Sequence, residues 1–336
     1  MPGIKKRVDS VAKQPFYHLR PNKNIDRSLF IQTLTGLSRH YPISNYHYIG
    51  FGSYLFDDFK LLHESLNISK MVSLEMDPLI YKRAKFNVPY NCIHIENTNS
   101  TDYLSELELE DKEHYIFWLD FVSPKDLGSQ LSDYATLINL LRPLDIVRIT
   151  LNASPAALGN CDDPDKQLER RLDKLKERVD SAYLPSSIQP SAVTTAEYPI
   201  TLLRILKAVS LKLLEGRPPY SPNFMFPLFS SIYEDGQQML TFTGIVLDDH
   251  AEEKYIIDSL SDYPHNTFKW DEPCKIEIPA LTVREITELN KLLPNQDVRQ
   301  QIINDFPFIF SEKEPEIVDS YISYYKLYPH YHQVNF

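Results

Sequence analysis

Five short apolar runs, each separated from the next by a segment of helical character, constrain the fold of this chain more than any other feature. The runs are His47–Gly52, Met71–Asp77, Cys92–Ile95, Tyr115–Asp120 and Ile146–Leu151. The segments between them are Asp57–Leu66, Pro78–Asn87, Ser100–Leu107 and Lys125–Leu141. Because strands that alternate with helices at this spacing form βαβ units, we expect an α/β fold with a mainly parallel sheet and helices on both faces.

The alternation ends after the fifth run. A charged helix is expected from Asp163 to about Ala182, and an amphipathic helix at about Ile200–Leu214. The runs Phe224–Tyr233 and Met239–Leu247 flank a turn that contains Gly236, which is typical of a β-hairpin. We expect this antiparallel pair to join the parallel strands and complete a Rossmann-like sheet of seven strands.

The chain is expected to have three parts. Residues 1–44 form a basic N-terminal arm and a helix at Ile25–Ser38, residues 45–250 form the sheet domain with an insert at 154–198, and residues 251–336 form an acidic, Tyr-rich extension that is mainly α-helical. Residues 1–40 carry eight Lys/Arg and two Asp/Glu, so an anionic partner is expected at the arm.

Within the arm, Arg20, Lys23 and Arg27 are close enough in sequence to form one cationic edge. In the extension, a short strand is expected at Ile276–Ile278 and a capped helix at Thr282–Leu293. Its tyrosines share one helical face, a spacing that is typical of core packing and also compatible with a protein partner. They are Tyr321, Tyr324, Tyr325 and Tyr328.

Composition limits the compartment and the partners. The net charge of −11 argues against broad nonspecific binding to nucleic acid, because that binding depends on neutralising phosphates. Three scattered cysteines, Cys92, Cys161 and Cys274, fit a reducing compartment. The N-terminus lacks the apolar segment of a signal peptide, and charged residues interrupt the most apolar stretch, residues 199–214. We therefore expect a soluble, cytoplasmic protein that does not bind membranes.

Two glycines and a carboxylate follow the first two predicted strands. In a chain with 9 glycines, Gly50 and Gly52 both fall in the first β–α turn, where parallel sheets bind ligands. Glu75 lies near the end of the second strand, and a carboxylate there can accept both hydroxyls of a ribose. The pattern therefore predicts a nucleotide-type cofactor, and the alternative is a tight turn with a surface acid.

The predicted strands and the turns after them read YIGFGS, MVSLEMDP, CIHIENTNS, YIFWLDF and VRITLNAS, and a hairpin follows. Taken in this order, they resemble the class I S-adenosylmethionine-dependent methyltransferases. In style they are most similar to small O-methyltransferases of the catechol type. The resemblance covers roughly residues 45–250, and it lies in the order and spacing of the motifs. It implies a methyltransferase that uses S-adenosylmethionine and transfers a methyl group to an unidentified acceptor at oxygen or nitrogen.

Site residues follow from this resemblance. Those implied for the cofactor are Gly50, Phe51, Gly52, Ser53, Glu75, Met76, Thr98, Asn99 and Ser100. Glu75 would hold the ribose hydroxyls and Met76 would pack on the adenine. Asp120 is expected to act as the base for the acceptor, with Asn152 as its orienting partner. The alternative for Asp120 is to cap the helix that begins near Pro124.

The sequence departs from the family in two places. Tyr54 stands where the glycine-rich turn usually has a third small residue. The fifth strand ends in Leu151-Asn152, whereas the metal-dependent O-methyltransferases have Asp-Asn, so no metal is expected there. His330 and His332 form an HxH pair without an evident third ligand.

Two other functions are compatible with the pattern. A methyltransferase-fold protein that has lost turnover can act as a cofactor sensor or as a scaffold in a larger assembly. A nicotinamide-dependent oxidoreductase shares the glycine turn and the acid, but its fingerprint needs a third glycine. Residues 54–57 are Tyr-Leu-Phe-Asp, which makes the oxidoreductase the weakest of the three hypotheses.

Overall fold

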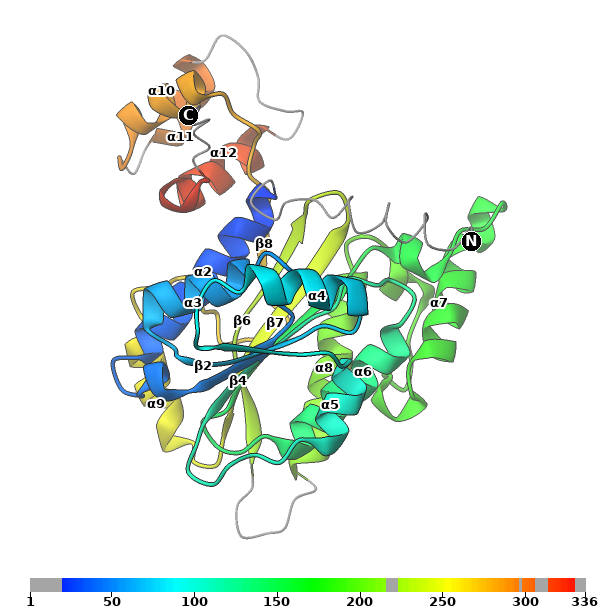
Figure 1. The fold of residues 1–336 in the computed structure, drawn as a ribbon. Coiled ribbons are helices and arrows are strands. Elements are labelled where there is room, and N and C mark those ends of the chain that lie inside the picture. The colour runs from blue at the N-terminus through cyan, green and yellow to red at the C-terminus, as the bar shows by residue number, and fades with distance from the viewer. Residues whose placement is uncertain (1–19, 216–222, 296–297, 306–313, 330–336) are drawn as a thin grey trace. The chain divides into compact units, whose positions relative to one another are not determined.

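The computed structural model describes residues 20–215, 223–295, 298–305 and 314–329 (Figure 1). The chain divides into two compact units. The larger unit comprises Phe30–Ile232 and Gln237–Cys274, and the smaller comprises Met1–Leu29, Tyr233–Gly236 and Lys275–Phe336. Most of the basic arm (residues 1–19) and the HxH pair lie outside the described residues.

A mixed sheet forms the centre of the fold. Its strands are β1 (His47–Gly50), β2 (Lys70–Leu74), β3 (Ile93–Glu96), β4 (Tyr115–Asp120), β5 (Ile146–Asn152), β6 (Phe224–Glu234), β7 (Gln238–Leu247) and β8 (Cys274–Ile276). Their order is β3-β2-β1-β4-β5-β7-β6-β8. The first five strands run parallel, and β7 pairs antiparallel with β5. The predicted α/β sheet with a terminal antiparallel hairpin is confirmed, and within the described residues β8 adds an eighth strand to the expected seven.

Within the larger unit, helices cover both faces of this sheet (Figure 1). The helices of the described residues are α2 (Pro21–Leu37), α3 (Asp57–Leu66), α4 (Pro78–Asn87), α5 (Ser100–Glu106), α6 (Leu127–Leu140), α7 (Gln167–Arg178), α8 (Tyr198–Glu215) and α9 (Ala251–Ser259), and, in the smaller unit, α10 (Val283–Leu292), α11 (Val298–Asp305) and α12 (Glu314–Tyr324). Helices α5, α6 and α8 pack together on one face, where Phe117, Tyr134 and Leu206 belong to the same buried cluster (Figure 1). On the other face, Phe30 of α2 contacts Trp118 of β4. No helix within the described ranges is long and apolar enough to cross a membrane.

One expected helix differs from the structure, and the described residues also contain a helix that the sequence does not predict. The charged helix expected from Asp163 begins as a 3-10 turn at Pro164–Lys166 and is α-helical only over α7. It ends where Val179 is extended and the Asp180 side chain accepts the Ala182 N–H, which starts a separate 3-10 turn. Helix α9 was not predicted, because its acidic sequence shows no apolar periodicity. It is held by the burial of Ile256 and by the Asp249 carboxylate, which accepts the Ala251 N–H.

A buried arginine lies between the aromatic side chains of the second face. The Arg148 guanidinium in β5 is fully buried, and its carbon is 4.6 Å from the ring centroids of both Phe30 and Trp118. Its Nη1 donates to Thr243 Oγ1 at 2.6 Å. The Trp118 indole in turn donates to Thr150 Oγ1 at 3.0 Å. These contacts fix the last residues of β4 and β5, where the candidate site begins.

The smaller unit contains the tyrosine face and the three residues of the expected cationic edge. Tyr321 and Tyr328 are buried with ring centroids 5.5 Å apart, so these two tyrosines pack in a core as expected. Lys23 and Arg27 are 2% and 4% exposed. The expectation that these two residues form an exposed cationic edge is therefore wrong. The short strand β8 and the capping box of Thr282 at α10 lie close to their expected places.

Candidate active site

The order in which the chain adds strands to the sheet reverses between β1 and β4. After β1 the chain continues to β2 and β3 on one side, and after β4 it continues to β5 on the other. Ligands of open α/β sheets bind at such a switch point, outside the carboxyl ends of the strands. The segments after β1 and β4 meet there, since the rings of Phe51 and Phe121 are 5.6 Å apart.

The turn after β1 is tightly packed against the protein itself. The N–H of Gly52 donates to Ser73 Oγ at 3.1 Å. A Cβ at Gly50 would lie 2.7 Å from the Tyr48 hydroxyl, and one at Gly52 would lie 2.6 Å from Ser73 Oγ. The close approach that the sequence suggested is therefore made, on the Cβ side, by side chains of the protein itself, from the sheet and from α3. Ser53, with a φ of 49°, gives the turn its unusual backbone.

We expect Gly52→Ala to destabilise the fold by about 1–3 kcal/mol, as overpacking of a tight site does. Besides Ser73 Oγ at 2.6 Å, the new methyl group would meet Phe56 at 2.8 Å and Phe59 at 3.0 Å. Urea denaturation measures the cost. The same substitution in a Ser73→Ala background should cost less, because the nearest atom is gone. A cost near zero in the wild-type background would contradict this packing.

Tyr54 replaces the third small residue of the family's turn without projecting into solvent. Its side chain is 6% exposed, and the Arg83 guanidinium of α4 lies 3.6 Å from the centre of its ring. A cation that close to an aromatic face is attracted by the ring's electrons. The departure from the family pattern is thus accommodated by packing between the turn and α4.

Glu75 lies directly after β2, with its backbone fixed by the next strand. Its N–H donates to the Glu96 carbonyl at 3.0 Å, and its carbonyl accepts from Asn97 Nδ2 at 2.7 Å. Its Oε1 accepts the Asp77 N–H at 2.9 Å. Burial raises the pKa of Glu75, the charge of Asp77 raises it further, and backbone N–H groups of Asp77 and Met76 oppose the rise. The result is a half-buried carboxylate at the carboxyl edge of the sheet.

The other residues expected at the cofactor differ in how firmly the protein holds them. Met76 is 73% exposed, whereas Thr98, Asn99 and Ser100 are half-buried. Asn99 caps α5 by accepting a backbone N–H through its side chain. The Ser100 hydroxyl donates to the buried Asp133 carboxylate. Asn99 and Ser100 therefore have structural roles in addition to any contact with a cofactor.

Asp120 ends β4 and pairs with Thr150 of β5. It lies at the same edge as the glycine turn, one residue before Phe121. The alternative role of Asp120 as a helix cap is wrong, because α6 begins at Leu127 and its N-cap residue is Asp126. The position of Asp120 therefore leaves its carboxylate at the end of the strand beside the switch point.

Asn152 ends β5 and uses both ends of its amide within the protein. Its Nδ2 donates to Gln237 Oε1 at 2.6 Å, and its Oδ1 accepts the Ser154 N–H at 3.1 Å. The side chain is 5% exposed. These contacts join the end of β5 to the hairpin turn and to the following loop. They are the amide contacts that the structure records, and neither of them reaches Asp120.

The family described as "Putative O-methyltransferase" matches residues 15–336. The chain belongs to this family. The match extends well beyond residues 45–250, over which the motifs alone resembled methyltransferases, and includes the C-terminal extension. The methyltransferase prediction is confirmed by this membership, and the family match gives no support to the scaffold or oxidoreductase alternatives.

No curated protein matches the chain. Among solved structures, Trm1 from Pyrococcus horikoshii with S-adenosyl-L-methionine has 11% identity over 70% of this chain and 58% of its own, with a TM-score of 0.44. The O-methyltransferase of Bacillus cereus in complex with SAH has 12% identity over 71% and 87%, with a TM-score of 0.37. The O-methyltransferase TomG from Streptomyces achromogenes, in complex with SAM, has 12% identity over 64% and 78%, with a TM-score of 0.34.

Proposed function

We propose that this chain transfers a methyl group from S-adenosylmethionine to an oxygen atom of an acceptor. The observation that carries the proposal is the half-buried Glu75 carboxylate at the tip of β2, next to a switch point in an O-methyltransferase family member. A carboxylate there suits a ribose diol, because two hydroxyls can donate to its oxygens. Nitrogen is the less favoured acceptor atom, since the family is described by O-methylation.

Several residues would hold the cofactor. Glu75 would accept the ribose hydroxyls, Met76 would cover the adenine, and residues 50–53 would line the methionine part. Thr98, Asn99 and Ser100 would lie beside the adenine edge. S-adenosylmethionine, when bound, supplies a methyl group carried on a positively charged sulfur.

Asp120 is the proposed base. Methyl transfer depends mainly on holding two reactants in line, so the protein needs to add little beyond position and one proton acceptor. The Asp120 carboxylate would take the proton of the acceptor hydroxyl as that oxygen bonds to the methyl carbon and the carbon–sulfur bond breaks, with a neutral thioether as the leaving group. Asn152 would act as a positioning residue for the end of β5, because its amide hydrogen-bonds to Gln237 in the hairpin turn and to Ser154 in the following loop.

Calorimetric titration of the purified protein with S-adenosylmethionine, and in parallel with NAD, tests the cofactor. We expect micromolar binding of S-adenosylmethionine and no heat from NAD. A screen of hydroxyl compounds with methyl-labelled cofactor then tests turnover. Binding of NAD alone, or of neither compound, would overturn the proposed function.

We also propose that the protein works in the cytoplasm, with partners at its two ends. Within the described residues, no disulfide involves Cys92, Cys161 or Cys274, which suits a reducing compartment. The excess of basic residues over 1–40, which remains when the buried Lys23 and Arg27 are left out, supports an anionic partner at the arm. The half-buried Tyr324 and Tyr325 support a protein partner at the C-terminal extension.

A further inference from the structure

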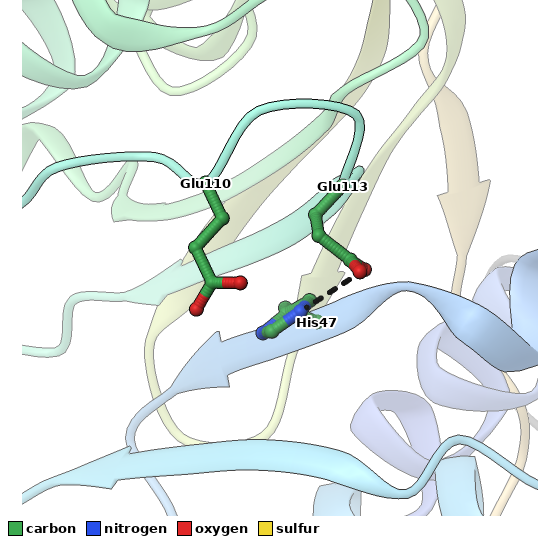
Figure 2. Close-up of side chains that lie close together, drawn as sticks. All are labelled: His47, Glu110 and Glu113. Carbon is green, nitrogen blue, oxygen red and sulfur yellow. Dashed lines mark hydrogen bonds and ion pairs between the residues drawn. The ribbon is translucent and has the colours of Figure 1, made fainter.

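A histidine and two glutamates meet at the amino-terminal edge of the sheet, at the other end of β1 from the glycine turn (Figure 2). His47 is the first residue of β1, and Glu110 and Glu113 lie in the loop before β4. One potential ligand atom of each residue lies within 4.8 Å of the other two. Figure 2 shows both glutamate side chains extending from this loop toward the imidazole of His47.

Neighbouring residues hold this cluster in place. His47 pairs with Tyr115 in the β1–β4 register, and the Tyr115 ring stacks on the imidazole at 4.8 Å. The Tyr115 hydroxyl accepts the Glu110 N–H at 3.0 Å, and Arg142 Nη2 donates to the Glu110 carbonyl at 2.6 Å. Such outer contacts orient the ligands of protein metal sites. Here they fix the imidazole plane and the loop backbone.

The chemistry of the three side chains favours one class of ion. An imidazole nitrogen with two carboxylate oxygens suits zinc, which binds three protein ligands and keeps a fourth position for water or substrate. Ligand atoms around tetrahedral zinc lie about 3.4 Å apart, as follows from bond lengths of about 2.1 Å. The cluster therefore needs to close by up to about 1.4 Å, and the exposed Glu110 has the freedom to do so.

We propose that His47, Glu110 and Glu113 form a zinc site that joins β1 to the loop before β4. The site is separate from the proposed cofactor site, and the proposal does not depend on methyl transfer. The ion would bind the folded chain, in which the three residues are together although 63 to 66 positions separate His47 from the glutamates. Zinc is therefore expected to raise the melting temperature.

Lys70 provides a second test of the proposal, because its ammonium group already forms an ion pair with Glu113. Its Nζ lies 2.6 Å from Glu113 Oε2, the same oxygen that lies 3.2 Å from His47 Nε2. A zinc ion on that oxygen must displace or repel the ammonium group. Lys70→Met is therefore expected to bind zinc more tightly than the wild type, whereas a cluster that is only an ion-pair network would gain no affinity.

Zinc titration against a chromophoric chelator tests the site on the metal-stripped full chain. The background carries His330→Gln and His332→Gln, which removes the HxH pair as a second place where zinc could bind. We expect one zinc ion per chain, and affinity at least about tenfold weaker in His47→Gln and in Glu110→Gln. As controls, His94→Gln and Glu108→Gln replace exposed residues of the same types outside the cluster and should leave the zinc affinity unchanged.

Glu110→Gln distinguishes a zinc site from a network of ion pairs that binds no metal. The ion pairs recorded for the cluster join Glu113 to His47 and to Lys70, so a purely structural network does not need the Glu110 carboxylate. Because Glu110 is exposed, the variant is expected to fold, which circular dichroism checks. Unchanged zinc affinity in Glu110→Gln, or no zinc binding by the background chain, would overturn the proposal.

Discussion

Replacing Glu75 by Ala is expected to reduce the affinity for S-adenosylmethionine by about 10²–10⁴-fold. The variant would lose two hydrogen bonds from the ribose hydroxyls to a charged acceptor, each worth about 1.5–3 kcal/mol. The carboxylate is half-buried and its backbone is fixed at the ends of β2 and β3, so its removal takes away an acceptor of fixed position. Calorimetric titration measures the change, with Glu106→Ala, at an exposed acid on α5, as the matched control.

Glu75→Gln separates this binding role from a role in folding. Burial raises the pKa of Glu75, so its ionised form costs stability in the folded chain. Wild-type stability should therefore fall as the pH rises from the ordinary pKa through the raised one, and the variant should lack that fall. At neutral pH the variant is expected to be at least as stable as the wild type yet to bind the cofactor weakly. Undiminished binding in Glu75→Ala would refute the proposed ribose site.

The elements around the site could be predicted where local signals are strong. Helix α4 begins at Pro78 as expected, because Asp77 accepts backbone N–H groups of the first turn and Pro78 fits the first helical position. Strand β4 has its expected bounds, since its unbroken apolar sequence is buried along nearly all its length. Helix α9 could not be predicted, because burial of Ile256 and Leu260 stabilises it and no local pattern does.

The contacts of individual site residues depend on tertiary structure. The sequence indicates that Gly52 needs space, but only the fold shows that Ser73, 21 positions away, fills it. The Asn152 amide is expected from the sequence to orient Asp120, but in the structure it donates a hydrogen bond to Gln237, 85 positions away. The zinc cluster was missed for the same reason, because β1–β4 pairing brings its residues together.

Asp120→Asn is expected to slow methyl transfer by about 10²–10⁴-fold, the usual contribution of a general base. The affinity for S-adenosylmethionine should stay within about tenfold of the wild type, because the side chain acts on the acceptor and not on the cofactor. Single-turnover transfer to an acceptor from the hydroxyl-compound screen measures the rate, and calorimetry measures the affinity. Asp126→Asn is the matched control, since Asp126 is an exposed acid on the segment that follows Asp120.

The pH dependence distinguishes a base from a residue that only shapes the site. If Asp120 removes the proton, raising the pH toward the pKa of the acceptor hydroxyl should narrow the rate gap between Asp120→Asn and the wild type, because solvent then supplies the ionised acceptor. A gap that stays constant with pH would mean that Asp120 positions the acceptor without taking its proton. A hundredfold loss of cofactor affinity would instead assign Asp120 to the cofactor, together with Glu75 and the turn after β1.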